Sequence, residues 1–264
     1  MTAQARGHAP FDERASNYHA HVWHVQYAER LIELARLPRG AAVLDVATGT
    51  GLAARAAARC VGDGGRVVGV DISRSMLDEA RALSSGSEFG HLTFELGDAT
   101  SLCEFGADSF DSVLCSAALL YMPVERALQA WRRVLRPGGV VGFSTMACGV
   151  PPAAQLFRDC ARDVGVTLRD PSASLGTQRL CREALEQAGF RVREVVPGRV
   201  EFTAADLGLA WEANLRTAGH EQVSTLRGEL TQKLEDVYRA RVSQAMSEGD
   251  SLRYADVFYA FGTV

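Results

Sequence analysis

Acidic residues and glycines follow apolar segments near the start of the chain. Asp45 lies in the short apolar segment 41–47, and a turn that contains Gly49 and Gly51 comes directly after it. Asp71 closes the next apolar segment about 20 residues after the turn, the usual spacing for an acid that binds ribose hydroxyls. Glycine lets a ligand approach the main chain, because no Cβ atom stands in the way. The pattern predicts a ligand that contains a ribose.

The class of adenosine ligand stays open at this point, since a dinucleotide site uses a similar turn and acid. Asp98 closes a third apolar segment, 91–99, where its carboxylate could accept a hydrogen bond from an adenine amino group. The Arg-Pro-Gly-Gly turn at 136–139 and an alternating aromatic segment at 253–264 are not part of the dinucleotide pattern. These features favour an adenosine ligand other than a dinucleotide.

Strand-like and helical segments alternate up to residue 146, and this order must position the acids. The expected strands are 41–47, 66–73, 91–99, a fourth within 110–121, 140–146, 191–204 with a bend at Pro197-Gly198, and 253–264. Helices are expected from the first turn through Cys60, after Ser73 and at 124–135. The alternation predicts an α/β fold with a doubly wound, Rossmann-like parallel sheet and helices on both faces.

Four regions follow from this order of elements. They are an N-terminal tail with cap helices (1–36), a ligand-binding core (37–203), a helical lid (204–250) and a final core strand (251–264). The lid and the cap helices are expected to roof a pocket for a second ligand. The candidates for its apolar lining, which could equally be ordinary core residues, are Phe157, Phe202, Trp211 and Leu215.

Composition and charge exclude several classes of partner. The net charge is −4 and no cluster of basic residues is present, so neither nucleic acid nor a membrane surface is expected as a partner. The six cysteines are scattered without a paired spacing, which predicts reduced thiols and no metal site. With no apolar leader or membrane-spanning run, we expect a cytoplasmic protein, either a monomer or a homodimer.

The series of motifs resembles the class I S-adenosylmethionine (SAM)-dependent methyltransferases. "VLDVATGTG", "VVGVDIS", "LGDAT", "FDSVLCSAALLYMP" and "VLRPGGVV" stand in that family's order and at its spacing over residues 40–146. The first motif is especially similar to the ubiquinone/menaquinone-biosynthesis branch and related small-molecule enzymes. The resemblance implies SAM as the cofactor, S-adenosylhomocysteine (SAH) as the product, and a seven-stranded sheet whose last strand is antiparallel.

The resemblance also implies roles for individual residues. Asp45, Gly49 and Gly51 would surround the methionine end of SAM, and Ala47 replaces the first glycine of the usual loop. Asp71 would bind the ribose hydroxyls. Further cofactor contacts are implied for Tyr18, Ile72, Met76, Asp98, Ala99, Cys115 and Ser116. The loop after the fourth strand often carries a histidine in this family, and this chain has Leu120 and Tyr121 there instead.

Three histidines lie close together before the core. His19, His21 and His24 suggest a metal site, but on a helix His19 and His21 point in different directions. A solvated or structural role is open for each, and at least one could act as a general base or contact the substrate, since the pKa of histidine suits proton transfer near neutrality.

The function expected from the resemblance is methyl transfer from SAM to an O, C or N atom of a small organic molecule. Abundant Ala, Arg and Gly resemble the usage of GC-rich bacteria, which favours a secondary metabolite as substrate. Three alternatives remain: a SAM-binding enzyme with non-methylating chemistry such as cyclisation, a non-catalytic SAM- or SAH-binding protein, and a nicotinamide-dependent oxidoreductase.

Overall fold

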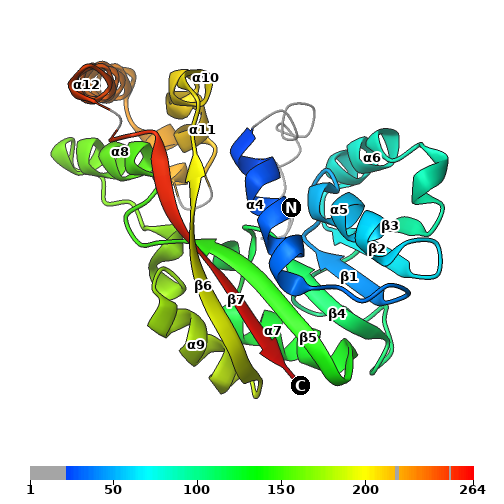
Figure 1. Ribbon diagram of the computed structural model, residues 1–264. Helices are drawn as coiled ribbons and strands as arrows, with labels where there is room; N and C mark the ends of the chain where they lie inside the picture. The colour runs from blue at the N-terminus through cyan, green and yellow to red at the C-terminus, as the bar shows by residue number, and fades with distance from the viewer. Residues whose placement is uncertain (1–21, 218–219, 250) are drawn as a thin grey trace.

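A seven-stranded sheet forms the centre of the molecule in a computed structural model that describes residues 22–217, 220–249 and 251–264 (Figure 1). The strand order is β3-β2-β1-β4-β5-β7-β6, and β7 is antiparallel to both of its neighbours. The strands are β1 (Ala42–Val46), β2 (Arg66–Asp71), β3 (Leu92–Leu96), β4 (Phe110–Cys115), β5 (Leu135–Met146), β6 (Arg191–Glu201) and β7 (Tyr254–Thr263). The expected doubly wound sheet with an antiparallel last strand is confirmed.

The central strands are buried on both sides, which explains their unbroken apolar sequences. All five residues of β1 are buried, because helices cover both faces of a parallel sheet. The expected turn at 136–139 lies instead within β5, which begins at Leu135. Its residues form a bulge between the pairs Phe110↔Leu135 and Ser112↔Val140, where Gly138 has a φ of 79°.

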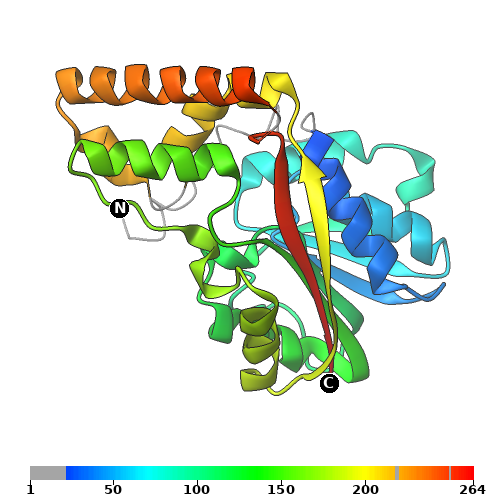
Figure 2. The same cartoon turned by 60° about the vertical axis from the view of Figure 1, so that its left-hand side comes forward.

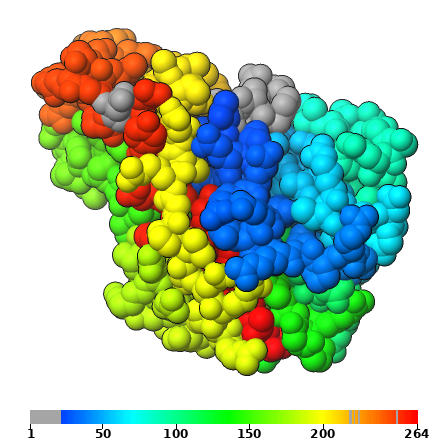
Figure 3. Space-filling view, viewed as in Figure 1, coloured from blue at the N-terminus to red at the C-terminus, as the bar shows by residue number. Residues whose placement is uncertain are grey.

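Helices cover the two faces of the sheet in separate groups. On one face, α4 (Val22–Ala35) packs against α5 (Leu52–Val61), and both belong to one apolar cluster. Figure 3 shows α4 in the middle of this face, between β6 and α5. The opposite face carries α7 (Val124–Val134) and α9 (Gln178–Gln187), whose buried residues belong to a second cluster. The helix α6 (Arg74–Leu83) flanks β2 and β3.

The outer part of the sheet departs from the expected details. The strand β6 is an edge strand, which suits Pro197 because proline cannot donate a hydrogen bond to a neighbouring strand. Its register irregularity lies between Val192 and Glu194, not at the predicted bend, and pairing continues through Pro197 and Gly198. A Cβ atom at Gly198 would lie 2.8 Å from the Tyr259 ring, so close packing explains this glycine.

A layer of helices stands above one end of the sheet and forms the lid (Figure 2). It contains α8 (Pro152–Asp163), α10 (Ala204–Gly208), α11 (Ala210–Leu215) and α12 (Gly228–Glu248). The helix α8 precedes the predicted lid region but packs against α12, and the predicted lid region begins with the two short helices α10 and α11. In the described part of the chain, no helix is long and apolar enough to cross a membrane.

Candidate functional site

The loop after β1 combines left-handed backbone with a buried acid. Ala47, Gly49 and Gly51 have φ values of 52°, 55° and 79°. This region costs an alanine roughly 1–2 kcal/mol, because its Cβ crowds the following carbonyl. Thr48 holds the turn, since its hydroxyl donates to Asp45 Oδ2 at 2.6 Å and its amide donates to the Val70 carbonyl. The loop is therefore fixed in shape before any ligand binds.

Gly51 packs against the protein interior, and it is not among the lining residues of the two cavities described below. A Cβ atom there would lie 2.8 Å from Cζ of Phe94 and 3.1 Å from Nη1 of Arg55. Arg55 is itself buried and donates to the Thr50 carbonyl at 2.6 Å. The predicted contact of Gly51 with the ligand stays a prediction. The structure gives a separate reason for glycine at this position: the absence of a Cβ atom lets the loop lie against the protein interior.

Asp45 is the electrostatic centre of the loop. Its side chain is fully enclosed, and burial raises its pKa from 3.8 to about 7. The Thr48 hydroxyl and the Ala54 amide oppose this rise, whereas the charge of Asp71 adds to it. Among the described residues, Oδ1 of Asp45 has no hydrogen-bond partner. An enclosed carboxylate oxygen without a donor suits a cationic ligand group.

Asp71 lies at the end of β2 and ties two loops together. Its Oδ2 accepts from the Gly49 amide at 2.8 Å, and its Oδ1 accepts from the Ser73 amide at 2.9 Å. A carboxylate has about four acceptor positions in all, which suits the predicted binding of ribose hydroxyls by Asp71. Ile72 is 41% exposed beside it, as a side chain against a ligand would be, whereas Met76 is buried below.

Asp98 and Ala99 form the turn after β3. Asp98 Oδ1 accepts from the amide and the hydroxyl of Thr100, both at 2.8 Å, and the Ala99 carbonyl accepts from Trp131 Nε1 at 2.8 Å. Within the described residues, Asp98 Oδ2 and the Ala99 amide make no hydrogen bond. The turn thus has one acceptor and one donor left, the pair that an adenine edge needs.

The residues after β4 differ in their access to the site. Cys115 is fully buried, and burial raises the pKa of its thiol far above the ordinary value, so it cannot serve as a thiolate. Ser116 and Ala117 line a cavity, and Ala117 has a φ of 56°. Ser116 and Ala117, which follow β4, therefore lie beside the loop after β1, because both segments line this cavity.

These elements enclose a small cavity, which we call the loop pocket. Its wall contains His24, Tyr27, Ala28, Asp45, Ala47, Thr48, Gly49, Leu52, Ala53, Ser116 and Ala117. No lysine or arginine is among these described lining residues. A pyrophosphate would need positive charge here, whereas the unpartnered oxygen of Asp45 suits an ammonium or sulfonium group. A cationic group bound in the loop pocket would therefore have a counter-charge in Asp45.

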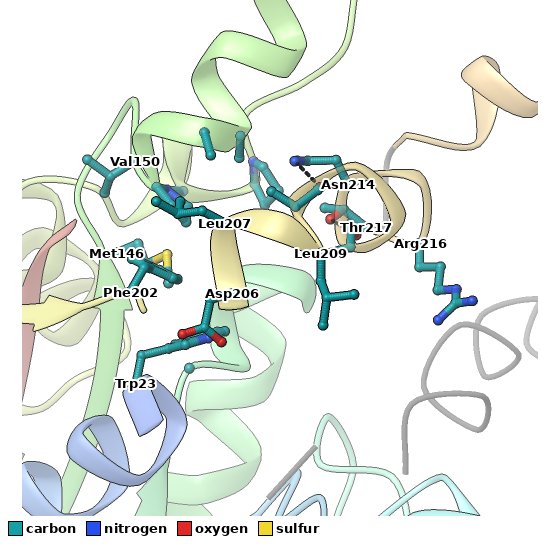
Figure 4. A pocket seen from close by; sticks show the side chains of 18 of the residues that line it. Trp23, Met146, Val150, Phe202, Asp206, Leu207, Leu209, Asn214, Arg216 and Thr217 are labelled. Carbon is teal, nitrogen blue, oxygen red and sulfur yellow. Dashed lines mark hydrogen bonds between the residues drawn. The ribbon is translucent and has the colours of Figure 1, made fainter. Parts of the chain in front are cut away.

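A larger cavity, the lid cavity, lies between the sheet and the lid. It encloses about 1260 Å³ counted with its open mouth, and most of its wall is apolar. Of the labelled side chains in Figure 4, Val150 lies highest and Trp23 lowest, both on the left, while Asn214 and Arg216 lie on the right. His24 and Ala117 belong to the walls of both cavities. The two cavities therefore meet at these residues.

The three predicted histidines do not have the same status. His24 is 4% exposed, and its ring lies 3.7 Å from the ring of Trp23. His19, His21 and the predicted cofactor contact Tyr18 lie outside the described residues. Within the described ranges, no group of three or more His, Cys, Asp or Glu side chains could hold a metal ion.

The structure separates the four candidates for the apolar lining of the second pocket. Phe202 lines the lid cavity, but Phe157 and Trp211 pack in an aromatic cluster with Tyr238 behind it. Leu215 is 36% exposed and is not part of the cavity wall. Three of the four candidates are thus core or surface residues of the lid.

Sequence reasoning missed several residues of the lid cavity, among them Trp23, Arg158 and Asp206. No short-range pattern marks these three residues. Gln155 and Arg162 lie three and four residues from Arg158, so its neighbours on α8 are polar as well as apolar.

Comparisons with known proteins agree with this geometry. A family model described as a methyltransferase domain matches residues 43–139. The O-methyltransferase resE of Aspergillus sclerotiorum is 30% identical over 201 residues, which are 69% of this chain and 72% of that enzyme. The ubiquinone/menaquinone biosynthesis C-methyltransferase UbiE of Geobacter sulfurreducens is 34% identical over 139 residues, 50% of this chain and about half (51%) of that enzyme.

A solved structure supports the fold over nearly the whole chain. The crystal structure of a candidate methyltransferase from Bacillus halodurans C-125 superposes with a TM-score of 0.63 at 21% identity. The match covers 89% of this chain and 97% of that one. Together with the loop pocket and the matched relatives, it leads to one conclusion: this chain belongs to the class I SAM-dependent methyltransferases.

Proposed function

We propose that this protein transfers a methyl group from SAM to an O, C or N atom of a small organic molecule bound in the lid cavity. The observation that carries the proposal is the meeting of the two cavities at His24 and Ala117. A donor in the loop pocket and an acceptor in the lid cavity would face each other there, and orientation of two reactants supplies much of the rate of a displacement. SAM supplies an electrophilic methyl carbon on a sulfonium.

The residues around the junction have separate tasks in this proposal. Asp45 holds the positive end of the donor, while Asp71 and the Asp98–Ala99 turn bind its nucleoside. Trp23, Leu207 and the other apolar side chains of the lid cavity exclude water. His24 contacts the acceptor, and it accepts a proton where the attacking group must lose one.

The acceptor is a small, mostly apolar molecule, in keeping with the wall of the lid cavity. A secondary metabolite fits this description. The relatives include an O-methyltransferase and a C-methyltransferase, so oxygen and carbon are the first acceptor atoms to test.

The decisive experiment uses SAM with a labelled methyl group and a metabolite extract, followed by mass spectrometry of the small molecules. We expect one compound to gain a single labelled methyl group. If SAM binds in a thermal-shift assay but no label leaves it, methyl transfer is refuted and the non-methylating or non-catalytic alternative takes its place. The same assay with a nicotinamide cofactor tests the oxidoreductase alternative, for which no binding is expected.

The role of His24 is tested in the same assay with His24→Gln and His24→Phe. A general base predicts a loss of kcat in both variants and a flattened acidic limb of the pH profile. A contact that only positions the acceptor predicts a higher KM for His24→Phe and near-normal kcat for His24→Gln.

A further inference from the structure

A single arginine lies in the wall of the lid cavity on the side of α8. Arg158 is only 4% exposed, yet it belongs to the cavity lining together with Val150, Ala153 and Ala154. A buried charge is costly unless it is paired and hydrogen-bonded. Its burial in the cavity wall therefore calls for a physical reason.

The partners of Arg158 hold it from one side. Its Nη2 donates to Gln155 Oε1 at 2.9 Å and lies 3.6 Å from Asp170 Oδ2, an ion pair without a hydrogen bond. Asp170 is fixed in turn, because its carboxylate accepts from the amides of Gly149 at 2.8 Å and Ser172 at 2.9 Å. Asp170 and Gln155 are not part of the cavity wall.

Most of the donors of the guanidinium remain available. A guanidinium has five N–H groups in a planar fork, and Arg158 uses one of them for Gln155. Within the described residues, Nε and Nη1 make no hydrogen bond, and neither nitrogen is sealed from solvent. The free side of the fork therefore belongs to the cavity, while Gln155 and Asp170 fix its orientation.

The other two charged side chains of the cavity wall, Asp206 and Arg216, differ from Arg158 in charge or in burial. Asp206 is an acid, and its carboxylate accepts from the amide and the hydroxyl of Thr203 at the start of α10. Arg216 has the same donor groups and also lines the cavity, but it is exposed at the C-terminal end of α11, whereas Arg158 is buried in the wall. Arg158 does not line the loop pocket, so its charge lies away from the junction at His24 and Ala117.

We propose that Arg158 binds a carboxylate of the acceptor molecule at the α8 wall of the lid cavity, as a recognition handle distinct from the atom that is methylated. This inference rests on the proposed function, because it assigns the lid cavity to the acceptor. A carboxylate can accept two parallel hydrogen bonds, one from the second N–H of Nη2 and one from Nε or Nη1, which a neutral amide cannot do. The acceptor class is thus an apolar small molecule that carries a free acid group.

The test compares two probes of equal shape, 4-phenylbutyrate and 4-phenylbutyramide, in the presence of SAH. Binding is followed by calorimetry and by the total tryptophan fluorescence, to which Trp23 in the cavity wall contributes. The wild-type protein is expected to bind the acid at least about tenfold more tightly than the amide. Arg158→Gln should bring the ratio close to one, and Arg158→Lys should leave a reduced preference, because it keeps the charge without the fork.

Arg162→Gln is the matched control. Arg162 lies one turn further along α8, is 64% exposed and pairs with Asp159, so its replacement should leave the preference of the wild type unchanged. Thermal melts and SAH affinity show whether each variant is folded. If Arg158→Gln does not fold, the acid preference of the wild type is compared with that of Arg158→Lys. A reduced preference in Arg158→Lys supports the inference, and an unchanged preference contradicts it.

Equal affinity for the two probes, no binding of either, or a preference that survives in Arg158→Gln would overturn the inference. Its failure is distinct from that of the proposed function. A labelled methyl product without any acid preference refutes the handle alone, whereas an Arg158-dependent acid preference without methyl transfer refutes the proposed function alone.

Discussion

Replacing Asp45 by asparagine should change the stability of the free protein and its affinity for SAM in opposite directions. Asp45 is enclosed, its Oδ1 has no donor among the described residues, and burial raises its pKa from 3.8 to about 7. Asparagine keeps an oxygen for the Thr48 hydroxyl but carries no charge. The free protein therefore loses an unfavourable buried charge, and the bound state loses its counter-charge.

The magnitude follows from the pKa difference between the folded and unfolded states. That difference is about 3, and each pKa unit corresponds to about 1.4 kcal/mol, so ionised Asp45 lowers the free energy of unfolding by up to about 4 kcal/mol. Because the folded state has the higher pKa, it binds more protons. Stability should thus fall as pH rises from about 4 to 7, and the loss is complete above pH 7.

Binding of a cation next to Asp45 reverses the effect. A hydrogen bond to a charged group contributes about 1.5–3 kcal/mol, so Asp45→Asn should raise the Kd for SAM by roughly 10- to 150-fold. In the wild type, SAM should bind more tightly as pH rises from 6 to 8, with release of a proton. The variant should show neither the pH dependence nor the proton release.

Calorimetry in buffers of different ionisation enthalpy measures the Kd and the released protons, and thermal melts at pH 5 and pH 8 measure stability. The reasoning is refuted if Asp45→Asn lowers the Tm of the free protein at pH 8, or if it leaves the Kd for SAM unchanged. Asp111→Asn is the control. Although burial opposes it, hydrogen bonds from the Ala42 amide and Arg136 lower the pKa of Asp111, so this change should lower Tm and leave SAM binding intact.

Three further changes test the loops of the site. Ala47→Gly should raise Tm by about 1–3 °C, because glycine adopts the φ of 52° without strain, and an unchanged or lower Tm would contradict this. Gly51→Ala should destabilise the protein by roughly 2 kcal/mol in chemical denaturation, since the new Cβ would meet the Phe94 ring; a neutral effect would show that the ring moves away. Trp131→Phe should leave the Ala99 carbonyl without its donor, which costs about 1–3 kcal/mol and weakens SAM binding in calorimetry; unchanged affinity would separate this turn from the adenine site.

The sequence by itself determined the order of strands and helices and the acids that close the strands. Alternating apolar segments and turn residues act over a few positions, so Asp45, Asp71 and Asp98 could be assigned to strand ends without coordinates. Local pattern could not give the bulge within β5 or the break between α10 and α11, because these depend on the neighbouring strand and on packing under the lid.

Only the tertiary structure decided which residues share a cavity. His24 on α4 and Ala117 after β4 line both cavities, because the two segments lie beside the loop after β1, and Arg158 joins the lid cavity from a helix more than a hundred residues further along the chain than His24. The reason that Gly51 must be glycine likewise lies in Phe94 on β3. Contacts between residues so far apart arise from the stacking of elements on the sheet, which no short-range pattern in the sequence records.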